Sequence, residues 1–72
     1  MKCQHYVIRV EGHLGSSWSD WFEGLEVGDK RDLHRKRTIT ILSGMMDQAA
    51  LHGTLNKIRD LGLRLLSVQV VE

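Results

Sequence analysis

The chain has 72 residues, a formal net charge of +1 and one cysteine, Cys3. This length fits one domain, residues 1–72, and the single cysteine excludes an internal disulfide that would stabilise so small a core. The low net charge excludes a strong overall field toward nucleic acid or membranes, and no apolar run approaches the ~20 residues that span a bilayer.

The same features bear on compartment and assembly. Residues 1–6 contain no apolar signal region. Together with the unpaired cysteine, this predicts a cytoplasmic protein. Because the core is small and has no covalent or metal support, we expect a second subunit to add to it, which predicts a homo-oligomer, most simply a dimer.

The first predicted elements are a strand and a short helix. Residues 5–11 alternate, with Tyr6, Ile8 and Val10 expected to face the core, and Gly12 ends the strand. Residues 17–24 are predicted to form a helix that begins at Ser17 and stops at Gly24. Four apolar side chains follow at the i, i+3, i+4, i+7 spacing of one helical face: Trp18, Trp21, Phe22 and Leu25.

The middle of the chain predicts two further strands around a polar segment. Leu25 and Val27 indicate a short second strand, and residues 28–37 form a polar hairpin or loop. Residues 38–42 alternate again, with Ile39 and Ile41 expected to face inward. The second strand is weakly marked, so a three-stranded sheet is the alternative.

The last third predicts a capped helix and a strand. Asp47 suits the N-cap, and Gly62 suits the left-handed position just past the helix end. The buried stripe of this helix consists of Leu51, Leu55, Ile58 and Leu61. In the final strand one expected face carries Leu66, Val68 and Val70, and the other carries Leu65, Ser67, Gln69 and Val71.

This order of elements, β-α-β-β-α-β, predicts an α+β ferredoxin-like fold, with a four-stranded antiparallel sheet and two helices on one face. The other face would be open, either solvated or used in face-to-face dimerisation. Strand phases assign to it His5, Val7, Arg9, Glu11, Thr38, Thr40, Leu42, Ser67, Gln69 and Val71. That set contains no phenylalanine, tyrosine or tryptophan, which disfavours the base stacking of RNA-recognition motifs.

A basic stretch is the candidate ligand or phosphate site. It comprises Lys30, Arg31, His34, Arg35, Lys36 and Arg37. Clustered cations can bind phosphate groups. The alternative is a solvated hairpin tip whose charges protect a sheet edge from unwanted pairing, and Asp29 and Asp32 dilute the positive charge.

No pattern predicts catalysis, a metal or a cofactor. Cys3 and His5 would supply two ligands on one strand face, whereas zinc needs three or four. Ser16, Ser17 and Ser19 are explained by helix capping. The glycines of residues 12–15 could bring backbone N–H groups to an anion, but a tight turn explains them equally. We therefore expect a protein that is not an enzyme.

Two resemblances add to these patterns. The segments Trp18-Ser-Asp-Trp-Phe22, Asp47-Gln-Ala-Ala-Leu-His-Gly53 and Ile58-Arg-Asp-Leu-Gly-Leu63 resemble small bacterial and archaeal proteins of unknown function, which implies a stand-alone ferredoxin-like domain. The passage from Leu51 through Gly62 to Val70 is similar to the helix–glycine–strand passage of ACT-type regulatory domains. That similarity implies amino-acid binding at a subunit interface.

The functional expectation is a non-enzymatic domain for protein interaction or assembly, acting as a homodimer. This expectation is based on a clear pattern of core residues and on the absence of a residue pattern for catalysis. The alternative is a small-ligand regulatory module that binds an amino acid or another anion near residues 12–17. A third possibility is nucleic-acid binding through residues 30–37, which would weaken steeply with salt.

Overall fold

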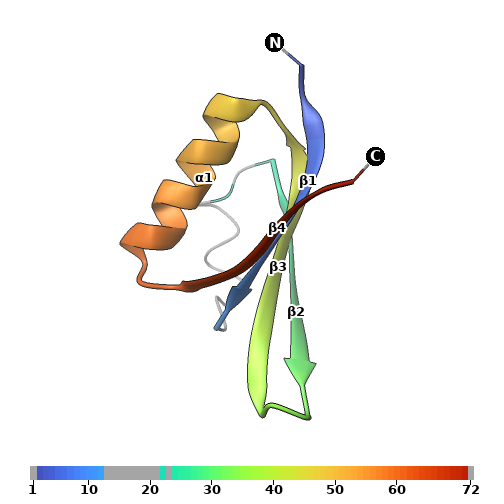
Figure 1. The fold of residues 1–72 in the computed structure, drawn as a ribbon, viewed down its shortest axis with the longest axis vertical. Coiled ribbons are helices and arrows are strands. Elements are labelled where there is room, and N and C mark those ends of the chain that lie inside the picture. Colours follow the sequence, from blue (N-terminus) through green and yellow to red (C-terminus); the bar gives the residue numbers. More distant parts are fainter. Residues whose placement is uncertain (1, 13–21, 23, 72) are drawn as a thin grey trace.

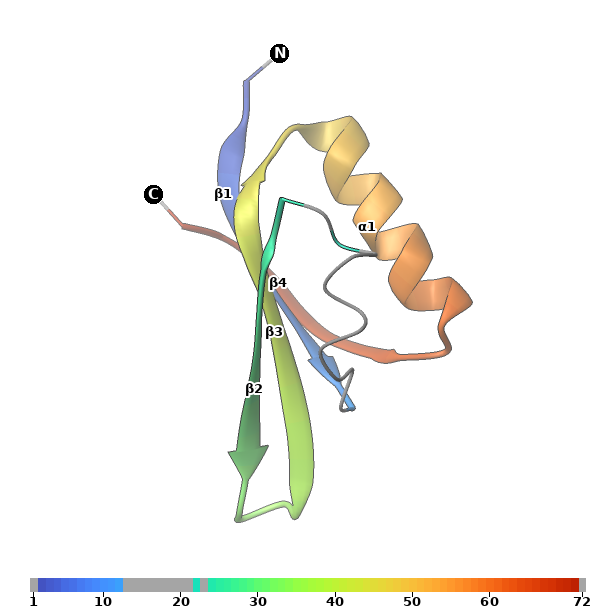
Figure 2. The same ribbon diagram turned by 180° about the vertical axis from the view of Figure 1, so that it is seen from behind.

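The computed structural model describes residues 2–12, 22 and 24–71. In this part of the chain the elements are β1 (Gln4–Glu11), β2 (Glu26–Asp32), β3 (Arg37–Met46), α1 (Gln48–Asp60) and β4 (Arg64–Val71). The strands form one antiparallel sheet in the order β2-β3-β1-β4, so β2 and β4 are its edges. Helix α1 lies over one face of the sheet, and the β2–β3 hairpin extends past the end of β1 (Figure 1, Figure 2).

The predicted ferredoxin-like β-α-β-β-α-β fold with two helices is wrong, because the described residues form a four-stranded antiparallel sheet with one helix. Most of the predicted first helix, residues 17–24, lies outside the described residues. Its described end is a turn in which the Leu25 N–H donates to the Phe22 carbonyl at 3.0 Å and Gly24 has a φ of 84°. The apolar spacing indicated shared burial, and Phe22 is buried, but shared burial does not fix the backbone conformation.

The second strand forms, and it is longer than predicted. It takes in most of the segment expected to be a polar hairpin or loop, so that only residues 33–36 make the turn between β2 and β3. An edge strand with little burial on either face has no reason to alternate, and only Val27 and Asp32 in β2 are even partly buried. The three-stranded alternative is therefore excluded.

The face of β3 that packs against α1 is the opposite of the one predicted. Thr40 and Leu42 are fully buried, whereas Ile39 and Ile41 lie on the face away from α1, hereafter the open face. The reason is pairing, because Ile8 of β1 lies directly opposite Leu42 and directly paired side chains share a face. The predicted open face is therefore wrong at Thr38, Thr40 and Leu42.

The buried Thr40 is compatible with the core because its hydroxyl is satisfied. Its Oγ1 lies 2.6 Å from the Gly12 carbonyl oxygen and 3.0 Å from Asp29 Oδ1, so the hydroxyl proton has an acceptor in either direction. A buried hydroxyl with such partners avoids the desolvation penalty of an unpaired group.

The predicted features of the second helix are confirmed by α1. Asp47 accepts a hydrogen bond from the Ala50 N–H at 2.8 Å. At the other end, Leu63 N–H donates to Ile58 and Gly62 N–H to Arg59, with Gly62 at φ 72°, which is a Schellman motif. The core that the helix covers contains Tyr6, Ile8, Val10, Phe22, Leu42, Met46, Leu51 and Ile58.

A bulge shifts the phase at the start of β4. Arg9 pairs with Ser67, but the next residue, Val10, pairs with Leu65, which leaves Leu66 as the extra residue. Leu65 therefore shares the face of Val10, where the sequence alternation had placed Leu66. Beyond the bulge the predicted alternation of Val68 and Val70 with Ser67 and Gln69 is confirmed by the register with β1.

Candidate functional site

Two surfaces of the domain expose apolar side chains to solvent. One is the edge strand β4, and the other is a hollow on the open face near the β2–β3 turn. The β2–β3 turn beside the hollow belongs to the edge of the sheet opposite β4, although the hollow extends to Arg9 on β1.

Strand β4 is an edge strand without charge protection. Residues 65–71 contain no charged side chain. Val68, Val70 and Val71 are 37%, 45% and 49% exposed, and Leu65 is exposed as well. The helix does not cover the end of the strand, because the carboxyl end of β4 lies on the side of the molecule away from α1 (Figure 1). An uncharged edge with exposed branched side chains is a template for pairing with another strand.

The opposite edge, β2, is protected in the way that edge strands usually are. Five of its seven residues are charged, and Gly28 interrupts it. Charged side chains on an edge discourage pairing with another chain. The sheet therefore has one edge that opposes association and one that favours it.

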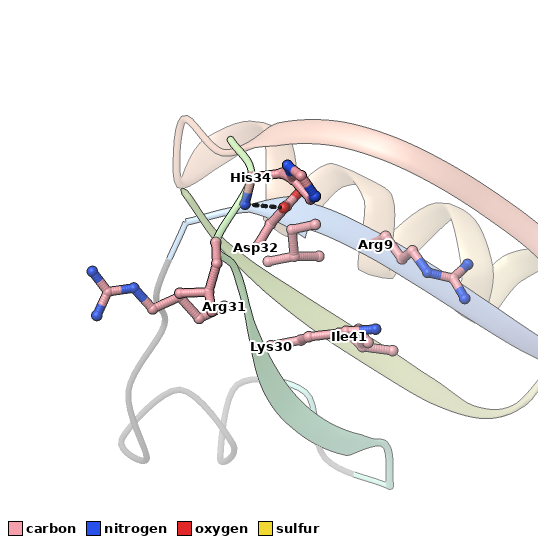
Figure 3. Close-up of a pocket in the computed structure, with 8 residues that line it drawn as sticks. Arg9, Lys30, Arg31, Asp32, His34 and Ile41 are labelled. Atoms are coloured by element: carbon pink, nitrogen blue, oxygen red, sulfur yellow. Dashed lines mark hydrogen bonds between the residues drawn. The ribbon is translucent and has the colours of Figure 1, made fainter. Parts of the chain in front are cut away.

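The hollow on the open face has a volume of about 470 Å³ and opens broadly to solvent. We call it the groove. Figure 3 shows Arg9, Lys30 and Ile41 around it and the Arg31 guanidinium pointing away from Lys30. It is lined by Arg9, Lys30, Arg31, Asp32, Leu33, His34, Ile39 and Ile41.

Strand pairing explains the apolar floor of the groove. Ile39 lies opposite Lys30, and Ile41 lies between Gly28 on β2 and Arg9 on β1. Because Gly28 has no side chain and no atom lies within 4 Å of where its Cβ would be, the β2 side of Ile41 is open. One side of Ile41 therefore lacks a cross-strand side-chain neighbour.

The wall of the groove is a turn fixed by one carboxylate. Asp32 Oδ1 accepts hydrogen bonds from the His34 N–H at 3.0 Å and the Arg35 N–H at 3.3 Å, an Asx-type turn. Lys36 then takes the left-handed conformation at φ 50°, which lets the chain enter β3. The turn holds His34 beside Asp32 above the groove (Figure 3) and leaves Leu33 78% exposed.

Some of the charges near the groove are already paired. Arg37 lies 3.9 Å from both Asp32 and Glu11, and Arg64 lies 3.9 Å from the same Glu11 carboxylate. Arg9 donates to Gln69 Oε1 at 2.7 Å. The side chain of Lys30, in contrast, makes no ion pair or hydrogen bond within the described part of the chain. Lys30 is therefore the available cation of the groove.

The six predicted site residues do not form one patch. Lys30 and Arg31 both line the groove, but they are successive residues of a strand, and the Arg31 guanidinium points away from Lys30 (Figure 3). His34 lines the groove, Arg35 and Lys36 belong to the turn, and Arg37 is engaged by two carboxylates.

Sequence reasoning missed five groove residues as site residues, namely Arg9, Asp32, Leu33, Ile39 and Ile41. Arg9 was assigned to the open face, but nothing local indicated that it lies near Lys30, because only the β1–β3–β2 pairing brings the two strands together. The two isoleucines were assigned to the core.

The other expected sites can be placed as well. Within residues 2–12, 22 and 24–71, no three histidine, cysteine, aspartate or glutamate side chains come together to hold a metal ion. No helix in that part of the chain is long and apolar enough to cross a membrane. The proposed anion loop, residues 12–17, lies outside the described residues except for Gly12.

The fold and its surfaces define a small α+β domain with one charged and one largely uncharged sheet edge and a cationic groove on an open sheet face. Residues 5–69 match the family described as Domain of unknown function (DUF8691). The match covers most of the chain, so the protein belongs to this family, in keeping with the expected likeness to small proteins of unknown function. No curated protein and no solved structure matches it.

Proposed function

We propose that this domain is a non-enzymatic assembly module that forms a homodimer by pairing β4 with β4 of a second copy. The observation that supports the proposal is that β4 is uncharged from residue 65 to residue 71 and about half exposed there, whereas the opposite edge strand β2 is heavily charged. The small core adds to the argument, because a 72-residue chain buries a limited apolar area by itself.

A second copy is the occupant that best suits this edge. Its strand offers the same unpaired backbone groups and the same uncharged side chains, so a twofold axis satisfies both edges at once. Val68 is the middle residue of the uncharged stretch 65–71. Antiparallel pairing centred there places Val68 opposite its copy and Ser67 opposite Gln69, with no like charges in the paired stretch.

The pairing would also cover apolar surface that the fold leaves exposed. Val68 and Val70 lie on the helix face beside Ile8 and Tyr6, so a neighbouring strand would extend the core sideways. The two sheets would join into one of eight strands, with the charged β2 strands at its outer edges, which oppose further growth.

The test is the mass in solution, measured by light scattering over a range of concentrations. We expect twice the 8.2-kDa chain mass. The double variant Val70→Lys/Val71→Lys, which places a cation on each face of β4, should be monomeric. Leu33→Lys makes the same kind of change at an exposed leucine on the β2–β3 turn and should remain dimeric.

Two results would refute the proposal. The first is a monomer at every concentration. The second is a dimer that survives the β4 double variant but is lost in Met45→Lys, which would place the interface on the open face, as face-to-face dimerisation requires. Thermal melting of each variant separates lost pairing from lost folding.

Two finer expectations accompany this proposal. We infer a cytoplasmic setting from the unpaired Cys3, which is exposed. Kinship with ACT-type regulatory domains is supported by the passage from α1 through the left-handed Gly62 into β4. It would place a ligand at the subunit interface, and a thermal shift with one amino acid that disappears in the monomeric variant is the corresponding measurement.

A further inference from the structure

We propose that the groove on the open face binds a small amphipathic anion, a free molecule that carries one carboxylate or phosphate on a short apolar chain. The anionic group lies between Lys30 and Arg9, and the apolar part lies on Ile39 and Ile41. The β2 side of the site lies two strands from the proposed dimer edge, and Arg9, which donates to Gln69 of β4, is where the two surfaces meet.

The apolar half of this site follows from the floor of the groove. Ile39 and Ile41 are branched side chains on the face away from α1, yet they are only partly exposed. The open β2 side at Gly28 gives an apolar chain access to Ile41. A volume of about 470 Å³ falls within the ~300–1,000 Å³ of small-molecule sites.

The charged half follows from the cations on the rim. Lys30 extends over β3 beside Ile41, and Arg9 lies on β1 opposite Ile41 (Figure 3). Lys30 has no partner within the described part of the chain, and Arg9 has the neutral Gln69, so neither cation is neutralised by a described carboxylate. Asp32, the acid on the rim, is held by the two backbone N–H groups of the turn.

A small ligand fits these observations better than a nucleic acid. The cations of residues 30–37 point in different directions, since the Arg31 guanidinium points away from Lys30 (Figure 3) and Arg37 is paired with two carboxylates. Among the residues that line the groove, the only ring is the His34 imidazole. Single-stranded nucleic acid is bound by aromatic stacking along a continuous cationic track.

The test is a titration of isotopically labelled protein, followed by backbone amide chemical shifts, with three probes of equal chain length. Octanoate carries the anion, octanol is neutral, and octyltrimethylammonium is cationic. We expect octanoate to shift the amides of Lys30, Ile39 and Ile41 selectively, and to bind several-fold more tightly than octanol. The cationic probe should bind more weakly than octanol.

Two variants test the charged part and the apolar part of the site separately. Lys30→Gln should weaken octanoate binding about threefold, the effect of one solvent-exposed ion pair, and should leave octanol binding unchanged. Gly28→Val adds a side chain beside Ile41 in space that is empty, and should reduce binding of both probes. Lys57→Gln, an equal charge change on exposed α1, is the matched control and should leave both affinities unchanged.

Several outcomes would overturn the proposal. These are shifts spread evenly over the protein, equal affinity for the three probes, or octanoate binding that Gly28→Val leaves intact. Binding of anionic vesicles without binding of free octanoate would identify a membrane surface instead. Salt-sensitive binding of an oligonucleotide at the same amides, with no response to octanoate, would favour the nucleic-acid hypothesis. Melting curves establish that each variant is folded.

Discussion

Gly44 of β3 lies directly against Leu25, at the point where the chain enters β2. A Cβ at Gly44 would be 2.6 Å from Leu25 Cδ2 and 3.2 Å from the Gly24 carbonyl oxygen. Gly44 is paired with the buried Tyr6, so its empty side-chain position is what allows the segment before β2 to close over the helix face. A glycine that looks like a strand breaker in the sequence is a packing residue.

The first prediction concerns this contact. Gly44→Ala should lower the free energy of unfolding by about 1–3 kcal/mol, because Leu25 and the backbone of Gly24 must move. Gly53→Ala is the control, since Gly53 lies in α1 with no atom near its Cβ position. There the same change should stabilise the protein by roughly 0.5–1 kcal/mol. Urea denaturation measures both, and equal effects would contradict the packing role.

The second prediction tests the two faces of β3. Leu42→Ala should cost about 2–5 kcal/mol, the usual range for a fully buried leucine. Ile41→Ala, on the open face, should cost clearly less, although the strand residues are adjacent. A larger loss at Ile41 than at Leu42 would mean that the face predicted from the alternation was right after all.

What could be predicted from the sequence depended on how local the signal was. Helix α1 was predicted because its cap at Asp47, its stripe and its end at Gly62 are all set within one segment. The face of β1 was predicted because Tyr6, Ile8 and Val10 alternate with no apolar competitor except Val7. In β3, however, Ile39 and Ile41 compete with Leu42 for the core, and the pairing with Ile8 decides between them.

The groove depended even more on distant pairing. Lys30 and Arg9 are twenty-one positions apart (30 minus 9), and β3, which separates their strands, is later in the chain than both. The basic stretch therefore indicated a charged turn but not a concave surface. The predicted first helix rested on a local apolar spacing, which indicates shared burial without fixing the backbone conformation, and only Phe22 and Gly24 of that segment are among the described residues.

The third prediction concerns the buried hydroxyl of Thr40. Thr40→Val keeps the size of the side chain but leaves the Gly12 carbonyl and Asp29 without this donor. We expect a loss of about 1–3 kcal/mol in the free energy of unfolding. Thr38→Val, two residues away on the same strand face and only partly buried, should change stability by less than about 0.5 kcal/mol. Chemical denaturation of the two variants provides the comparison.

The fourth prediction concerns the turn that walls the groove. Asp32→Ala removes the acceptor of the His34 and Arg35 N–H groups and one partner of Arg37. Amide hydrogen exchange should therefore quicken at residues 33–37. The amides of β1 and α1 should keep their protection. Asp60→Ala removes an exposed carboxylate near the end of α1 and should leave the exchange of the turn unchanged. Unchanged exchange in Asp32→Ala would show that the turn does not depend on this side chain.

The fifth prediction fixes the register of the proposed dimer. If β4 pairs antiparallel about Val68, the two Val68 Cα atoms approach to about 4.5–5.5 Å, which a disulfide can bridge. In a Cys3→Ser background, Val68→Cys should therefore form a covalent dimer under mild oxidation, seen as a doubled mass in non-reducing electrophoresis. Leu33→Cys, more exposed but far from β4 on the β2–β3 turn, should cross-link slowly and only at high concentration. Faster cross-linking at Leu33 than at Val68 would refute edge pairing about this residue.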